Sequence, residues 1–334
     1  MTTRPPRSAT IADVARRAGV SVPTVSRVLN ANPKVDPELA ERVRAAIAEL
    51  QYSASPLARS LALGKTHTVS VIIPDLRNPT FHEILRGISR AAIEDGYHVL
   101  IADSAEVVEE ERALAEQTRR RTDGVILCAP RLEAAALAEV LPALQPVVLI
   151  NRETHSGVPA VSADYRQSLG ELLQHLYDLG HRRLLYLAGV AGSVSNQNRL
   201  AALDDFRRLH ADVHIGEAPC GVGFEDGAAV VDVVQAYDVT AVVAFNDLVA
   251  MGLLSALESR GIGVPQQLSV VGFDDIPFAA YTKPPLTTAA VPSFEMGQQA
   301  WRAMVALLNS KTKVPSVMTL PTLQVRGSTG PAAE

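Results

Sequence analysis

The chain lacks the features that would place it in a membrane or at a metal centre. It has no apolar run long enough to span a bilayer and no cleavable signal peptide, so we expect a cytoplasmic protein. Its two cysteines, Cys128 and Cys220, show no metal-ligand spacing, which favours buried thiols. No solenoid-type repeat is visible. The length of 334 residues suits two or three domains with substantial cores.

Motifs of common enzymes are also missing. There is no phosphate-binding loop ending in Gly-Lys-Ser/Thr, no GxSxG elbow and no HExxH motif. The eight histidines are scattered, and we expect His181 at a helix C-terminus, where it suits the helix dipole. Asp274 and Asp275 cannot serve as paired acids on a regular strand, because adjacent side chains point to opposite faces. These absences favour a protein that is not an enzyme and needs no cofactor.

The charge is unevenly distributed along the chain. Residues 1–65 carry ten Lys and Arg against five Asp and Glu, whereas the whole chain has a net charge of −5. A basic head and an acidic body are expected when only one end of a protein meets phosphate. A further basic run, Arg119-Arg120-Arg121, predicts a solvated helix end, with a second phosphate-contacting patch as the alternative.

Residues 10–30 predict two short helices joined by a tight turn, which is the plan of a helix-turn-helix DNA reader. Thr10 can cap the first helix, and Gly19 supplies the left-handed residue that the turn needs. Ser21 can cap the second helix, with Pro23 in its first turn. The apolar residues recur at helical spacing and are Ile11, Val14, Ala15, Ala18, Val20, Val25 and Val28.

The remaining side chains of the second helix would face outward. Arg27 can make a bidentate contact to guanine, and Thr24 and Ser26 suit phosphate oxygens. The alternative is an ordinary helical hairpin with a polar face. The side chains expected on or near the outer surface are Val22, Pro23, Thr24, Ser26, Arg27 and Asn30.

Two further segments follow. A third helix begins at Asp36 or Pro37, and its inner stripe runs from Leu39 to Leu50 before Tyr52 ends the unit. Residues 55–65 then predict a short hinge helix, which is unstable alone in water. Either this segment is a plain linker, or it folds when clamped between a partner subunit and DNA, with a leucine available to wedge between base pairs.

From Thr68 onward, short apolar runs alternate with helical stretches. Runs rich in Val, Ile and Leu suit strands buried on both faces of parallel sheets, and the alternation implies right-handed crossovers. The fold class is therefore α/β, with a small helical head. The runs are 69–73, 99–102, 125–128, 147–150, 184–187, 241–245 and 269–273.

Several of these runs end in polar residues. Ligands of open α/β sheets bind at the carboxyl ends of strands, so the set predicts a polar cleft. For any single residue the alternative is a helix cap or turn, and Asn246 in particular could cap the helix that starts near Leu248. The polar residues that follow the runs are Asp75, Asp103, Asn151, Arg152, Asn246, Asp247, Asp274 and Asp275.

Motifs spread over nearly the whole chain resemble the LacI/GalR (lactose-repressor/galactose-repressor) family of bacterial transcription regulators. They are the block from residue 10 to the hinge, Leu179-Gly180-His181-Arg182-Arg183, Phe245-Asn246-Asp247, the run 270–275 and Pro285-Leu286-Thr287-Thr288. The resemblance implies a two-lobed, periplasmic-binding-protein-like body with two parallel sheets joined by three crossings.

The resemblance also implies domain boundaries. A DNA-binding domain would span 1–54, a hinge 55–65, and an effector-binding and dimerisation domain 66–334. The first lobe of the body would comprise about 66–162 and 291–320, and the second about 163–290 and 321–330. The chain stops at Glu334 without a heptad tail, which favours a dimer.

Residue by residue, the resemblance places a hinge leucine, Leu61, in the DNA minor groove. Val22 and Pro23 stand where relatives often carry polar residues, so we expect thymine-methyl contact there. The residues expected to contact DNA are Thr10, Ser21, Val22, Pro23, Thr24, Ser26, Arg27, Asn30, Tyr52 and Leu61.

An effector would bind between the lobes. An aromatic position that stacks on effectors in several relatives is Val222 here, with Phe224 as a substitute. The residues expected to bind the effector are Asn78, Phe81, Asn151, Arg199, Asn246 and Asp274.

These inferences predict a dimeric transcription factor, a repressor of a near-palindromic operator, controlled by a small-molecule effector. The polar set suits sugar hydroxyls, and a nucleoside or purine is the alternative. A solute-binding protein without a regulatory role would share the body, but it would need a signal peptide and would lack the basic head. Steep salt dependence of DNA affinity would support the regulator, and catalytic turnover would support an enzyme.

Overall fold

A computed structural model describes residues 9–29, 34–52, 64–152, 157–309 and 313–333. The chain forms two compact units, Met1–Thr66 and His67–Glu334. Asn30, Leu61 and the expected hinge helix, apart from its last two residues, lie outside the described residues.

The first unit contains three helices, α1 (Ile11–Ala18), α2 (Val22–Leu29) and α3 (Pro37–Glu49). Thr10 and Asp13 form a capping box at the start of α1, and Asp36 caps α3. Gly19 ends α1 with a φ of 65°, a conformation that glycine adopts without steric cost. The helices bury a small core of Val14, Ala15, Ala18, Val25, Val43 and Ala46.

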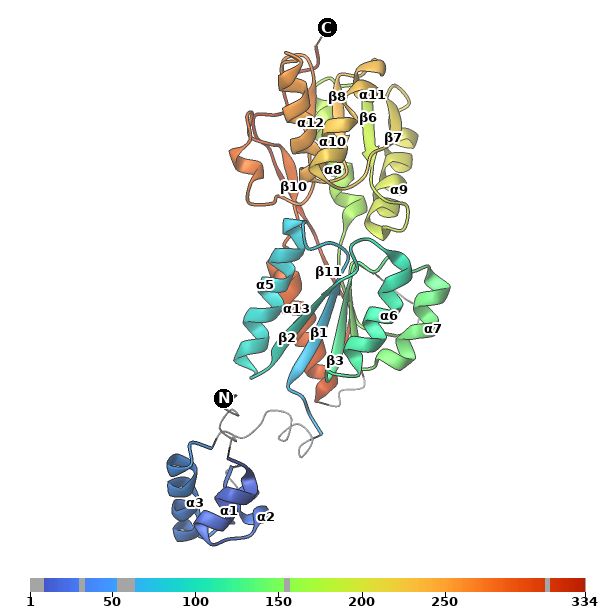
Figure 1. The fold of residues 1–334 in the computed structure, drawn as a ribbon. Coiled ribbons are helices and arrows are strands. Elements are labelled where there is room, and N and C mark those ends of the chain that lie inside the picture. Colours follow the sequence, from blue (N-terminus) through green and yellow to red (C-terminus); the bar gives the residue numbers. More distant parts are fainter. Residues whose placement is uncertain (1–8, 30–33, 53–63, 153–156, 310–312, 334) are drawn as a thin grey trace, which may run out of the picture. The chain divides into compact units, whose positions relative to one another are not determined.

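In the second unit, the first lobe is built on a six-stranded parallel sheet in the order β11-β5-β4-β3-β1-β2. Helices α5 and α13 pack on one face of this sheet, and α6 and α7 cover the other (Figure 1). The strands are β1 (Thr68–Ile73), β2 (His98–Asp103), β3 (Gly124–Cys128), β4 (Val147–Ile150), β5 (Ala160–Ala163) and β11 (Val317–Thr319). The helices are α5 (Pro79–Glu94), α6 (Val108–Arg119), α7 (Ala134–Leu144) and α13 (Ser293–Leu308).

The second lobe is built on a four-stranded parallel sheet in the order β7-β6-β8-β9. A two-stranded antiparallel sheet pairs β10 with β12. The strands are β6 (Arg183–Ala188), β7 (His214–Pro219), β8 (Ala241–Ala244), β9 (Ser269–Val271), β10 (Thr288–Ala290) and β12 (Thr322–Gln324). The helices are α8 (Tyr165–Asp178), α9 (Val194–Leu209), α10 (Phe224–Ala229), α11 (Val231–Ala236), α12 (Asp247–Ser259) and the 3₁₀ turn η1 (Ala279–Tyr281).

Alternate side chains of the central strands enter different cores. Val71 of β1 belongs to the core under α5 and α13, whereas Ile72 belongs to the core under α6 and α7. In the second lobe, Val243 faces α8 and α9, and Val242 faces the opposite helices. A strand that is buried on both faces must be apolar throughout, which is why these strands read as continuous apolar runs.

The chain passes three times between the lobes, from β5 to α8, from β10 to α13 and from β11 to β12. The α/β class and the two parallel sheets agree with expectation, and the antiparallel β10–β12 pair was not foreseen. One strand departs from expectation. We expected residues 99–102 to be buried on both faces, but β2 is an edge strand, and Leu100 and Ile101 are exposed.

Candidate functional site

In the first unit, α2 presents an exposed surface that combines apolar side chains with an arginine. Val22 is 41% exposed, and Pro23 and Arg27 are also exposed. Thr24 and Ser26 are half-buried, and the Thr24 hydroxyl lies 2.9 Å from the exposed Ser21 hydroxyl. The guanidinium of Arg27 is therefore available for a base edge, and the same helix carries Thr24 and Ser26.

The other two described head residues of the expected DNA-contacting set differ in exposure. Thr10 is exposed, but its hydroxyl donates to Asp13 Oδ2 at 2.6 Å as part of the cap of α1. Tyr52 is half-buried and packs against the head core. Arg42 of α3 donates to Ala18 O at 2.6 Å, and this bond fixes the end of α1 against α3.

In the second unit, a cavity lies between the two lobes, and we call it the inner cavity. Its walls come from the carboxyl ends of strands in both sheets, from the first turn of α5 and from the first two turns of α9, as expected for an α/β ligand site. Five of the six expected effector residues line it: Asn78, Phe81, Asn151, Arg199 and Asp274.

Arg199 is the most unusual side chain of the inner cavity. It lies in the second turn of α9, is 2% exposed, and its guanidinium carbon is 4.0 Å from the ring centre of Phe273 and 4.6 Å from those of Tyr165 and Phe245. Its Nε and Nη1 have no hydrogen-bond partner among the described residues. A buried guanidinium with unused donors is a strong site for a hydrogen-bond acceptor on a ligand.

Asp274 faces the same guanidinium. Its Oδ1 lies 3.9 Å from Arg199 Nη2, and its Oδ2 accepts a 2.9 Å hydrogen bond from the Thr80 hydroxyl. Burial raises the pKa of Asp274 to about 6, and the nearby Arg199 charge and the Thr80 hydrogen bond oppose that rise. Above this pKa the group is an ionised carboxylate, which can accept hydrogen bonds from ligand hydroxyls.

Asp247 supports the loop that carries Asp274. It is fully buried, and it accepts hydrogen bonds from the Thr288 hydroxyl at 2.6 Å and from Ile276 N at 2.8 Å. Burial, followed by the charge of Asp274, raises the pKa of Asp247 well above its usual value. A Cβ on Gly272 would lie 2.2 Å from Asp247 Oδ1, so glycine is required there.

Asn246 does not reach the inner cavity. Its side chain caps α12 by accepting from Val249 N at 2.9 Å, and it donates to Val222 O at 2.9 Å. The capping alternative is therefore the one observed, and Asn246 acts on the cavity through Val222, which lines it. Phe224 begins α10, is 43% exposed and is not among the lining residues, so it does not replace an aromatic at Val222.

Sequence reasoning missed an ion pair in the cavity wall. Arg131 donates to both carboxylate oxygens of Glu106, each at 2.8 Å, and both residues line the inner cavity. A Cβ on Gly192 of the second lobe would lie 3.2 Å from Arg131 O, so the lobes touch at this point. The arginine sits three residues beyond β3, where a polar residue at a strand end is the available signal.

Backbone strain gathers at the inner cavity. Four non-glycine residues with positive φ line it: Glu106 (60°), Ala129 (45°), Asn151 (52°) and Asp274 (112°). Such conformations cost free energy and are retained where surrounding structure enforces them, commonly at ligand sites. Asn151 shows how: its side chain donates to the Tyr165 hydroxyl at 2.8 Å and accepts from Ala163 N at 3.1 Å.

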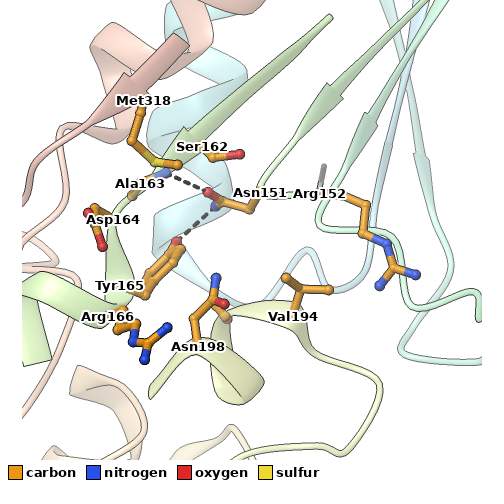
Figure 2. A pocket seen from close by; sticks show the side chains of 11 residues that line it. Asn151, Arg152, Ser162, Ala163, Asp164, Tyr165, Arg166, Val194, Asn198 and Met318 are labelled. Atoms are coloured by element: carbon orange, nitrogen blue, oxygen red, sulfur yellow. Dashed lines mark hydrogen bonds between the residues drawn. The ribbon is translucent and has the colours of Figure 1, made fainter. Parts of the chain in front are cut away.

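Figure 2 shows the lining of a second hollow, which we call the outer pocket. Asn151, Tyr165 and Ser195 line both this pocket and the inner cavity. Beyond these shared residues the outer pocket is lined by Arg152, Ser162, Ala163, Asp164, Arg166, Val194, Asn198 and Met318.

His181 does not stabilise a helix dipole as expected. His181 is buried, with its ring nitrogens 2.8 Å from the Thr240 hydroxyl and 3.0 Å from Gly330 O, and burial lowers its pKa. A neutral packed histidine replaces the expected dipole-stabilising one.

Cys128 is buried and Cys220 only partly so. Arg119 is half-buried and donates to Gln145 O, whereas Arg120 and Arg121 are exposed.

The described part of the chain shows neither a metal-binding cluster nor a membrane-spanning helix. There, no group of three or more His, Cys, Asp or Glu side chains is placed to hold a metal ion. No helix of those ranges is long and apolar enough to cross a membrane.

Comparison with known proteins matches both units. The family model of bacterial regulatory proteins, lacI family, matches residues 10–55, and the model of the periplasmic binding protein-like domain matches residues 173–329. Catabolite control protein A of Priestia megaterium is 31% identical over 321 residues, which cover 93% of this chain and 96% of the relative.

Two further relatives cover nearly the whole chain. The ribose operon repressor of Escherichia coli K12 is 31% identical over 329 residues, 96% of this chain and 99% of the relative. The crystal structure of the lac repressor dimer bound to operator and the anti-inducer ONPF is 26% identical, has a TM-score of 0.87, and covers 97% of this chain and 100% of that chain. The chain therefore belongs to the lacI family of bacterial regulatory proteins.

Proposed function

We propose that this protein is a repressor that binds a specific operator through α2. Its affinity for the operator changes when an effector occupies the inner cavity. The observation that carries the proposal is Arg199, a buried guanidinium with two unused nitrogens, in a chain that also exposes a helix-turn-helix surface. The unused donors support a ligand site, and the exposed Arg27 supports base recognition. The presence of both features in one chain supports regulation rather than catalysis. A role in binding DNA supports a cytoplasmic location for the protein.

We propose residues 1–54 as the DNA-binding domain, 55–65 as the hinge and 66–334 as the effector-binding and dimerisation domain. Two heads of a dimer would read half-sites related by a two-fold axis, so the operator is a near-palindrome. The relative solved as a lac repressor dimer on operator supports this arrangement. Effector binding would shift the population between two arrangements of the lobes and so change operator affinity.

A sugar is the effector class that the site supports best. Arg199 offers donors and Asp274 offers acceptors within one cavity, and Asn151, Ser195 and Thr80 add neutral polar groups. This mixture suits adjacent hydroxyls, each of which donates and accepts. One relative is a ribose operon repressor by name. A nucleoside or purine is the second candidate, but the wall at Val222 offers no aromatic ring for a base.

The experiment begins with selection of bound sequences from random duplex DNA by the full-length protein. Operator affinity is then measured by fluorescence anisotropy with and without sugars and nucleosides. We expect a near-palindromic site, a steep loss of affinity with salt, and a change in affinity on addition of one sugar class. No enrichment of any sequence would contradict the regulator, and an unchanged affinity with a bound sugar would contradict effector control.

A further inference from the structure

The inner cavity and the outer pocket share a wall, and α9 contributes to both. Ser195 lines both spaces, Asn198 lines the outer pocket, and Arg199 lines the inner cavity. On a helix, residues three and four apart lie on one face, so Ser195 stands beside both of the others. The first two turns of α9 therefore border both spaces.

Unpaired polar atoms mark both spaces. Four buried side-chain nitrogen or oxygen atoms of the described residues have no hydrogen-bond partner: Ser162 Oγ, Arg199 Nε, Arg199 Nη1 and Ser293 Oγ. Folded proteins keep few such atoms, and each calls for an explanation such as a bound ligand or water. Three of the four belong to residues that line these two adjoining spaces. A ligand confined to the inner cavity would leave Ser162 unpaired.

The outer pocket has the chemistry of a hydroxyl-binding surface. Asn198 is exposed on α9, and its amide offers both donors and an acceptor (Figure 2). Ser162 adds a hydroxyl, and the shared Asn151 and Ser195 add polar atoms at the boundary. Tyr165 is the aromatic residue of its lining, and the Tyr165 hydroxyl already accepts a hydrogen bond from Asn151 Nδ2 at 2.8 Å.

We propose that the effector is a two-ring sugar, a disaccharide or a glycoside with a polar second ring. One ring occupies the inner cavity against Arg199 and Asp274, and the second lies in the outer pocket against Asn198 and Ser162. The glycosidic link lies beside Asn151, Tyr165 and Ser195, which line both spaces. This inference rests on the proposed function, since it specifies the effector of the same site.

The test is isothermal titration and thermal shift of the full-length protein with cellobiose, maltose, lactose and sucrose, and with glucose, galactose and fructose. Cytidine and adenosine are included as single-ring sugars that carry a base. We expect one disaccharide or more to bind more tightly than the monosaccharides it contains. Ser162→Ala and Asn198→Ala should each weaken that disaccharide about 3- to 10-fold, the range of one lost hydrogen bond, and leave its monosaccharides unaffected.

Ser162→Ala separates a ligand contact from a structural role. Since its hydroxyl is buried and unpaired in the free protein, its removal should leave the melting temperature of the free protein unchanged or raised. A structural serine would instead lower it. Gln197→Ala is the matched control for Asn198→Ala, because Gln197 is the exposed neighbour on α9 and lines neither space.

Each outcome is decisive. If monosaccharides bind as tightly as every disaccharide, or if both variants bind disaccharides like the wild type, the two-ring effector is wrong, while the regulator stands if that sugar still alters operator binding. Binding of a nucleoside alone also overturns the two-ring sugar and keeps the regulator. If no compound binds, both the proposal of a sugar effector and the proposal of a two-ring sugar are wrong.

Discussion

The hydroxyl of Thr80 donates a 2.9 Å hydrogen bond to Asp274 Oδ2, and this bond joins the two lobes. Thr80 lies in the first turn of α5, in the first lobe, and Asp274 follows β9 in the second. Hydrogen bonds to an ionised acceptor are stronger than those between neutral groups. Because both residues also line the inner cavity, the bond links the position of the lobes to the site where the effector would bind.

Thr80→Val tests this bond. Valine preserves the branched shape but removes the donor, so Asp274 keeps its burial and loses a partner. We expect the free energy of unfolding of the second unit at pH 7.5 to fall by about 1.5–3 kcal/mol, as for other hydrogen bonds to charged groups. Thr80→Ser retains the hydroxyl and serves as the control in urea unfolding. Equal stability of the two variants would show that the bond contributes nothing.

Asp274→Asn should change how stability depends on pH. The pKa of Asp274 is raised from 3.8 to about 6, so between these values the folded protein binds more protons than the unfolded chain. The contribution of this group to stability is therefore fully present below about pH 4 and is lost as pH rises to about 6. A two-unit shift corresponds to a change of about 3 kcal/mol at most.

The measurement is the difference in unfolding free energy between wild type and Asp274→Asn from pH 4 to pH 7.5. The groups facing Asp274 are Arg199, Thr80 and Asp247, and the pKa of Asp247 is itself raised. Asp247 is present in both proteins, so the difference isolates Asp274 and its coupling to that neighbour. We expect the wild type to lose stability relative to the variant between pH 4 and 6, and a constant difference above pH 7. A difference that is flat throughout would contradict the raised pKa.

Arg199→Met should separate effector binding from DNA binding. Methionine roughly fills the aromatic slot between Tyr165 and Phe273 but donates no hydrogen bonds. Two lost bonds from a charged donor amount to about 3–6 kcal/mol, so we expect at least a hundred-fold loss of sugar affinity with operator affinity retained. Arg208→Met, on the exposed end of the same helix, is the control. Retained sugar response in the Arg199 variant would place the effector elsewhere.

Part of the inner cavity was predictable from a local rule, whereas Asn78, Phe81 and Arg199 were expected only from the family resemblance. Strand ends in parallel sheets gather at one edge, so polar residues after apolar runs led to Asn151 and Asp274. The same rule failed at Asn246, because asparagine is also a preferred helix cap and that use consumes its side chain. The spacing of residues along the chain cannot distinguish the two uses.

The features that could not be predicted depend on contacts between segments that are distant in the sequence. Glu106 and Arg131 meet only after two strands and a helix have packed, and no local pattern links them. His181 is buried by Thr240 and by the C-terminal segment at Gly330, which removes the solvent that a dipole-stabilising charge would need. Strands β5, β7, β10, β11 and β12 were not predicted, because they are short or lack a continuous apolar run.

Arg27→Ala should alter which DNA sequence is preferred, and not only how tightly DNA is held. Arg27 is exposed in the last turn of α2, where a bidentate contact to guanine would fix one base pair of each half-site. We expect the selected operator to be bound about 1–3 kcal/mol more weakly, and the preference at that base pair to be relaxed. Arg44→Ala is the control, since Arg44 is exposed on α3 and pairs with Glu41. The measurement is repeated selection from random DNA, with anisotropy at two salt concentrations. If the Arg27 variant selects the wild-type sequence and loses affinity equally on all DNA, Arg27 contacts phosphate and another residue reads the base.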